Sequence, residues 1–192
     1  LTMYVIHLII LAIMGINPIR YVKKTLEVLI FAFTSRSSAG ALPLNVQTQT
    51  QRLGVPEGIA NFSASFGLSI GQNGCAGIYP AMLAIMVAPV AHVDIDIPFI
   101  LTLIAVVVIS SFGVAGVGGG ATFASILVLS TLNLPVALAG VLISIEPIID
   151  MGRTALNVND SILAGTGTAR LTGNLDKEKF NSNHYGELST ES

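Results

Sequence analysis

The stretch PFILTLIAVVVISSFGVAGVGGGATFASILVLST, residues 98–131, decides the fold. It predicts a strongly apolar helix over residues 98–110, a glycine-rich break over 111–120 and a second apolar helix over 121–131. At 1.5 Å per residue the second helix covers about 17 Å, whereas the hydrocarbon core of a bilayer is about 30 Å thick. The pattern therefore indicates a re-entrant hairpin, in which the chain enters a membrane and leaves on the same side.

The composition extends this interpretation to the whole chain. Of 192 residues, 52% are hydrophobic and 10% are charged, whereas soluble domains carry about 25% charged residues. No Asp, Glu, Lys or Arg lies between Glu57 and Asp94, or between Asp96 and Glu146. Each gap exceeds the roughly 20 residues of one spanning helix. We expect an all-α multi-pass membrane protein with interrupted transmembrane helices.

The same counts exclude several classes of protein. A net charge of −2 leaves no basic surface for nucleic acid. One cysteine, Cys75, permits neither an intrachain disulfide framework nor a multi-cysteine metal site. The histidines His7, His92 and His184 lack metal-ligand spacing. No cofactor is expected.

Breaks in the apolar pattern divide the chain into segments. Because Leu1 opens the chain inside an apolar run without an initiator Met, we expect a C-terminal fragment of a longer protein. Asn17 and Pro18 are suited to cap and open a helix. The predicted segments are the end of a transmembrane helix (1–16), a transport domain (17–170) and a polar cytoplasmic tail (171–192), which is expected to be disordered from Gly173. The transport domain comprises a hairpin (17–53), a broken helix (56–92), a second hairpin (97–132) and a last helix (135–170).

Two hairpin tips with the pattern Ser-Ser-x-Gly, at residues 37–40 and 110–113, are each followed by a long helix that carries polar residues, and together they form a repeat. Paired, interrupted apolar segments are a sequence pointer to the binding site of a transporter. Lys and Arg gather near residues 20–24 and 170–179 and are absent from the 92–96 loop. Because basic ends face the cytoplasm, the first hairpin should enter from inside and the second from outside.

The octapeptide DMGRTALN, residues 150–157, carries the strongest chemical signal. Asp150, Arg153, Thr154 and Asn157 fall at i, i+3, i+4 and i+7 and share one helical face. Ionisable groups at membrane depth indicate a functional site, although an i,i+3 ion pair that only stabilises the helix is the alternative. In the functional interpretation Asp150 receives a substrate ammonium, and Arg153 binds a carboxylate through its planar fork.

The helix breaks are candidates for the rest of the site. Both Ser-Gly tips open new helices, whose free N–H groups favour anionic substrate groups, and the glycine run 116–120 is interpreted as part of a movable gate. The unwound stretch 71–74 exposes carbonyls that can coordinate Na⁺. The alternative for each Ser-Gly tip is a plain tight turn, and the alternative for the stretch 71–74 is a kink caused by glycine.

Two enzyme motifs are rejected. GLSIG, residues 67–71, matches G-x-S-x-G but lacks the preceding strand and a suitable downstream His. GVGGGA, residues 116–121, matches a dinucleotide fingerprint, but its next acidic residue is Glu146. No enzymatic activity is expected.

Four motifs resemble, in order, the dicarboxylate/amino acid:cation symporter family, which includes the glutamate transporters. They are SSAGALP (37–43), GQNG (71–74), AGV (115–117) and DMGRTALNV (150–158), and the likeness runs to Arg170. Gln72-Asn73-Gly74-Cys75 and Asn159-Asp160 are most similar to the bacterial L-cystine:cation branch. The resemblance implies a homotrimer in the bacterial inner membrane that works by an elevator motion.

The resemblance also assigns roles. The substrate-binding residues would be Ser37, Ser38, Val114, Ala115, Gly116, Asp150, Arg153, Thr154 and Asn157. Asp150 would bind the α-amino group and Arg153 the far end of cystine. The tentative Na⁺ ligands would be Gly67, Ser69, Asn73, Ser111, Gly113, Asn157 and Asp160. Gly71, Asn73 and Ser161 depart from the family pattern and remove carboxylate or amide ligands, so fewer sodium ions or proton coupling is expected.

The predicted function is uptake of L-cystine in symport with a cation, Na⁺ or H⁺. A dicarboxylate or acidic amino acid carrier on the same fold is the first alternative, because Arg153 suits both. An intramembrane hydrolase using Ser69 or Ser37, and a truncated inactive product, are the others.

Overall fold

The computed structural model describes residues 1–114, 119–137, 140 and 145–183. Within these ranges every regular element is helical and no strand occurs, as the composition predicted. The helices are α1 (Thr2–Ile13), α2 (Pro18–Ser35), α3 (Leu42–Gln47), the π-helical η1 (Thr48–Arg52), α4 (Glu57–Ile70), the π-helical η2 (Asn73–Ile78), α5 (Tyr79–Val90), α6 (Ile97–Ser111), α7 (Gly120–Thr131), α9 (Glu146–Leu171) and α10 (Lys177–Asn181).

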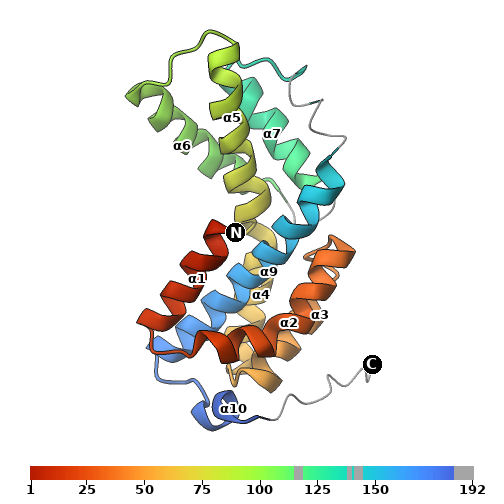
Figure 1. Ribbon diagram of the computed structural model, residues 1–192, viewed down its shortest axis with the longest axis vertical. Coiled ribbons are helices and arrows are strands. Elements are labelled where there is room, and N and C mark those ends of the chain that lie inside the picture. The colour runs from red at the N-terminus through yellow and green to blue at the C-terminus, as the bar shows by residue number, and fades with distance from the viewer. Residues whose placement is uncertain (115–118, 138–139, 141–144, 184–192) are drawn as a thin grey trace.

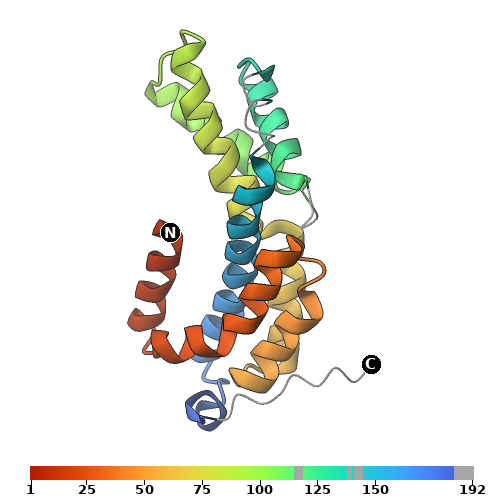
Figure 2. The same cartoon turned by 45° about the vertical axis from the view of Figure 1, so that its right-hand side comes forward.

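The helices form two groups along an elongated molecule, and α9 connects them (Figure 1). One group holds α1 to α4 and α10, which surround the C-terminal part of α9. The other holds α5, α6 and α7, which pack beyond its N-terminal end, and the turned view agrees (Figure 2). The break between α4 and η2 lies where the two groups meet, beside α9.

Local chemistry explains where α2 begins and ends. The side chain of Asn17 accepts a hydrogen bond from the Arg20 backbone N–H at 3.1 Å, and Pro18 opens the helix, as the sequence predicted. Arg36 ends it with φ of 53°, a left-handed conformation that is uncommon for a residue with a Cβ. This turn directs the chain into the tip of the first hairpin.

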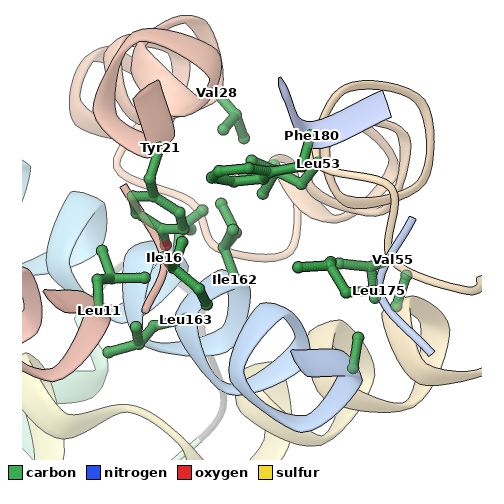
Figure 3. Packing of buried hydrophobic residues seen from close by; sticks show 14 of the residues in the cluster. Leu11, Ile16, Tyr21, Val28, Leu53, Val55, Ile162, Leu163, Leu175 and Phe180 are labelled. Atoms are coloured by element: carbon green, nitrogen blue, oxygen red, sulfur yellow. The ribbon is translucent and has the colours of Figure 1, made fainter. Parts of the chain in front are cut away.

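The larger apolar core lies around the C-terminal half of α9 (Figure 3). Tyr21 and Val28 of α2 and Ile162 of α9 are fully or almost fully buried in it. Leu53 and Phe180 complete it from the end of the first hairpin and from α10. A second core, formed by α5, α6 and α7, contains Leu83, Val87, Leu103, Val128 and Leu129.

Helices α4 and α9 approach each other closely at Gly67. A Cβ added to Gly67 would lie 2.5 Å from Cβ of Ser161, a distance that real side chains do not adopt. Only glycine therefore allows the two backbones to come this near. This contact fixes the end of α4, and with it the helix break, against α9.

The last long helix begins later than the sequence suggested. We expected one helix over 135–170, but residue 145 lies in a turn and α9 starts at Glu146. Pro147, in the first turn, explains the start. It has no N–H to donate to a preceding turn, and its ring disfavours helix before it. Residues 138–139 and 141–144 lie outside the described part of the chain.

The prediction of a disordered tail from residue 173 is wrong for residues 173–183. This segment packs against the first hairpin through Leu175 and Phe180, which are 8% and 5% exposed. The Nζ of Lys24 donates hydrogen bonds to the Lys179 carbonyl at 2.7 Å and to the Arg52 carbonyl at 2.8 Å. Two apolar side chains and a buried ammonium thus order a segment of polar composition.

The surface is apolar where a soluble protein would be polar. One described helical stretch, Glu57–Val90, is long and apolar enough to cross a bilayer, and Thr2–Ile13, Ile97–Ser111 and Gly120–Thr131 are shorter apolar helices. On α6, Leu101, Ile104 and Ile109 are each more than half exposed. Such contiguous apolar faces indicate contact with lipid or with further protein.

Candidate functional site

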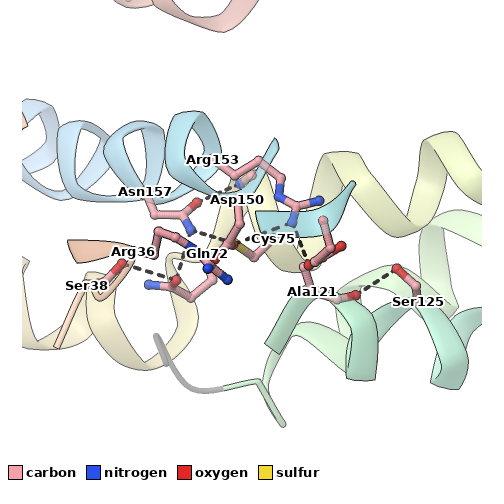
Figure 4. Close-up of polar contacts among 11 residues, drawn as sticks. Arg36, Ser38, Gln72, Cys75, Ala121, Ser125, Asp150, Arg153 and Asn157 are labelled. Atoms are coloured by element: carbon pink, nitrogen blue, oxygen red, sulfur yellow. Dashed lines mark hydrogen bonds and ion pairs between the residues drawn. The ribbon is translucent and has the colours of Figure 1, made fainter. Parts of the chain in front are cut away.

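Three elements bring the candidate site together at the helix break (Figure 4). The polar stripe of α9 supplies Asp150, Arg153 and Asn157, which are all buried. The break between α4 and η2 supplies Gln72 and Cys75, and the tip of the first hairpin supplies the remaining polar groups. A π-helical turn such as η2 commonly marks a functional site.

Asp150 holds the centre of the stripe and is paired on two sides. Its Oδ2 accepts from Nε of Arg36 at 3.1 Å, and its Oδ1 lies 3.5 Å from Nη2 of Arg153. The thiol of Cys75 donates to the same Oδ1 at 3.8 Å. The Asp150 side chain is 6% exposed and that of Arg36 is 35% exposed. Asp150 is therefore paired with two arginines of the chain itself, and a substrate ammonium at Asp150 stays a prediction.

Arg153 is oriented by two acidic groups and one ring. Its Nη2 donates to Oε1 of Glu146 at 2.7 Å, and its guanidinium lies 4.0 Å from the ring centre of Tyr79. A guanidinium over an aromatic face is attracted by the ring quadrupole. Nε and Nη1 of Arg153 are buried and have no hydrogen-bond partner among the described residues. Those two donors are therefore available to a substrate.

Asn157 connects α9 to the helix break. Its Oδ1 accepts from the backbone N–H of Gly74 at 2.7 Å. Its Nδ2 lies 2.9 Å from Oε1 of Gln72 and 3.1 Å from Sγ of Cys75. A Cβ on Gly74 would lie 3.0 Å from the Arg153 carbonyl, so a larger residue there would require α9 to shift by a few tenths of an ångström. Thr154 is buried on the same helix.

The first hairpin tip reaches this network through one of its two predicted serines. Ser38 is buried, and its Oγ donates to Oε1 of Gln72 at 3.5 Å. Ser37 instead uses its Oγ to accept from the backbone N–H of Gly40 at 3.0 Å, which stabilises the turn. In the second tip, Val114 is buried beside Ala76, whereas the predicted Ala115 and Gly116 lie outside the described residues.

The predicted sodium ligands fall into two sets. Gly67, Asn73 and Asp160 line one cavity of about 600 Å³ between α4 and α9. Ser69 and Ser111 are not among its lining residues and donate their hydroxyls to the carbonyls of Ser65 and Val108, at 3.1 and 2.7 Å.

Gly113 is exposed and Asn157 belongs to the network at the helix break, so neither lines that cavity.

Two observations limit cation binding in that cavity. The carbonyl of Gly67 already accepts from Nε2 of Gln72 at 3.0 Å, and Oδ1 of Asp160 lies 2.7 Å from Nε2 of His7. Oδ2 of Asp160 is buried without a hydrogen-bond partner in the described structure. A cation here would coordinate that free oxygen or displace the Gln72 amide.

Sequence reasoning missed Arg36, Glu146 and Tyr79. Glu146 had a usable signal, because it precedes Asp150 by four residues and extends the polar stripe by one turn. Arg36 and Tyr79 had none, since only the tertiary fold brings them to α9. The G-x-S-x-G serine, Ser69, lies in the last turns of helix α4 rather than on a strand-to-helix elbow.

Comparisons with known proteins address the family of the chain. Residues 1–171 match the profile described as the Sodium:dicarboxylate symporter family. The chain is 70% identical over 181 residues to the L-cystine uptake protein TcyP of Shouchella clausii and 66% identical over 181 residues to that of Bacillus licheniformis. Its identity to the Bacillus thuringiensis protein is 64% over 182 residues. Each match covers 94% of this chain and 39% of the relative.

Proposed function

Because this chain belongs to the Sodium:dicarboxylate symporter family, we propose that it forms the substrate-binding part of a transporter that takes up L-cystine with a cation. The relatives named for L-cystine uptake support the substrate. The chain spans 39% of their length, so the proposal concerns a transporter of the length of these relatives that contains this chain, called the full-length protein below.

One observation carries the proposal. Asp150 and Arg153 are buried side by side next to the break between α4 and η2, with Arg153 presenting two unpartnered donors. Buried charges are costly unless they are paired or serve a ligand. L-cystine carries an ammonium for Asp150 and, at its far end, a carboxylate for a free donor of Arg153.

We also propose a membrane arrangement for the same helices. Helices α2 and α3, and helices α6 and α7, are the two re-entrant hairpins of a multi-pass protein of the bacterial inner membrane. The exposed apolar face of α6 and the short length of α7 support this arrangement. In a homotrimer, the upstream segments would form the scaffold and this chain the part that moves in an elevator motion.

The coupling ion is Na⁺ or H⁺. Asp160 is the acidic group beside the cavity that Gly67 and Asn73 also line, and its free Oδ2 supports a role in cation coupling. Uptake of labelled L-cystine by the full-length protein in vesicles, with the Na⁺ and pH gradients imposed separately, distinguishes the two ions.

The test of the function itself is Asp150→Asn in the same uptake assay. We expect uptake to fall at least tenfold, because one charge-assisted hydrogen bond contributes about 1.5–3 kcal/mol. Asp94→Asn, on the exposed loop before α6, is the matched control and should transport normally. Wild-type uptake by Asp150→Asn would remove Asp150 from the site.

A dicarboxylate or acidic amino acid carrier is the second candidate. The free Nε and Nη1 of Arg153 support this candidate as well as they support L-cystine. The side chain of an acidic amino acid also offers a carboxylate at the end of the molecule far from its ammonium. Competition of labelled L-cystine uptake by L-aspartate and by succinate separates the two candidates.

A further inference from the structure

Glu146 and Arg153 form an ion pair that leaves polar atoms of both side chains unused. The two residues are 6% and 8% exposed, and Oε1 of Glu146 lies 2.7 Å from Nη2 of Arg153. Oε2 of Glu146 and both Nε and Nη1 of Arg153 are buried without a hydrogen-bond partner among the described residues. If the ion pair served only to neutralise Arg153, we would not expect it to leave a buried acceptor of Glu146 and buried donors of Arg153 without partners.

We propose that this pair binds the distal amino acid head group of the substrate. Oε2 of Glu146 accepts hydrogen bonds from the distal ammonium, and Nη1 of Arg153 donates to the distal carboxylate. The inference rests on the proposed function, because L-cystine carries an ammonium and a carboxylate on one carbon at each end. The ammonium and the carboxylate of such a head group are close together, as are the carboxylate of Glu146 and the guanidinium of Arg153. The two pairs of opposite charges can therefore face each other.

The spacing along α9 supports this assignment. Glu146 and Asp150 are four residues apart on one face of the helix, which places them about 6 Å apart along its axis. The two Cα atoms joined by a disulfide lie about 4.4–6.8 Å apart. Asp150 and Glu146 are therefore spaced to receive the two ammonium groups of one cystine molecule.

The position of Arg153 fits a molecule with two zwitterionic ends. Arg153 contacts both carboxylates, at 2.7 Å for Glu146 and 3.5 Å for Asp150, and Tyr79 covers one face of its guanidinium. A dicarboxylate has no ammonium for either acid, and an acidic amino acid has one. Glu146 is thus a residue that selects cystine over those substrates.

The experiment measures binding to the purified full-length protein. L-cystine is compared with the mixed disulfide of cysteine and 3-mercaptopropionate, which keeps the distal carboxylate but lacks the distal ammonium. The mixed disulfide of cysteine and cysteamine lacks the distal carboxylate instead. We expect each analogue to bind the wild-type protein about 10- to 100-fold more weakly than L-cystine, the range of one charge-assisted hydrogen bond.

The variant Glu146→Gln completes the test. Its affinity for L-cystine should fall to that of the ligand without the distal ammonium, while its affinity for that ligand stays within about threefold of the wild-type value. Glu57→Gln, the same change at an exposed position on α4, should leave all three affinities unchanged.

Two results would overturn the assignment. Equal wild-type affinity for L-cystine and for the 3-mercaptopropionate disulfide excludes a distal ammonium site, whatever any variant does. An equal loss for both ligands in Glu146→Gln shows that Glu146 only positions Arg153. If the wild-type protein does not bind L-cystine at all, the proposed function fails, which is a separate result.

Discussion

Replacing Arg153 with lysine tests the geometry of the site while keeping its charge. Arg153 contacts Glu146 and Asp150 at 2.7 and 3.5 Å, stacks on Tyr79 at 4.0 Å and still has two free donors. A lysine ammonium is a single point that can neutralise the acids but cannot also present a planar fork. Loss of the Nη1 donor to a carboxylate should weaken L-cystine binding by about 1.5–3 kcal/mol, roughly 10- to 100-fold.

The lysine variant is more informative than alanine. Arg153→Ala would leave Glu146 and Asp150 buried without their shared cation, at a cost of about 3–5 kcal/mol in stability, so lost activity would not identify a binding role. Calorimetric titration of the purified full-length protein with L-cystine gives the affinity. Arg170→Lys, at the other end of α9, is the control and should bind normally. An affinity of Arg153→Lys within threefold of wild type would refute the reasoning.

Two further predictions concern stability, each measured by thermal unfolding of the full-length protein. Gly67→Ala should destabilise it by about 1–3 kcal/mol, because its Cβ would lie 2.5 Å from Cβ of Ser161. Gly58→Ala meets no atom within 4 Å and should be neutral or slightly stabilising; equal effects would contradict the close contact. Lys24→Met removes two hydrogen bonds to carbonyls and should cost about 2–4 kcal/mol and speed proteolysis after residue 172. Lys23→Met, at an exposed position, should do neither, and an unchanged digestion rate in Lys24→Met would show that α10 docks without that lysine.

The sequence predicted those elements whose causes are local. Helix α4 ends at the glycine-rich break, and α2 begins at Asn17 and Pro18, because capping and breaking depend on neighbouring residues. The polar stripe on α9 was readable because helical periodicity places Asp150, Arg153 and Asn157 on one face.

What the sequence did not predict depends on contacts between distant residues. Arg36 lies 114 residues from Asp150, and nothing in its local pattern indicates that its side chain turns towards α9. The packing of residues 173–183 depends on Phe180 meeting Lys24 and Leu53, whereas composition alone suggested disorder. The start of α9 at Glu146 had a local signal in Pro147, which the long apolar pattern obscured.

Because residues 173–183 are attached to the first hairpin, a force applied to that segment acts on the hairpin. The Asp176 N–H donates to the Gly54 carbonyl at 2.9 Å, and Lys24 bonds the Lys179 carbonyl. A bead, surface tether or fluorescent protein attached just after residue 183 would transmit its load to the base of the hairpin that carries Ser38. Dyes attached there for single-molecule work would report displacement of that hairpin rather than of a loose tail.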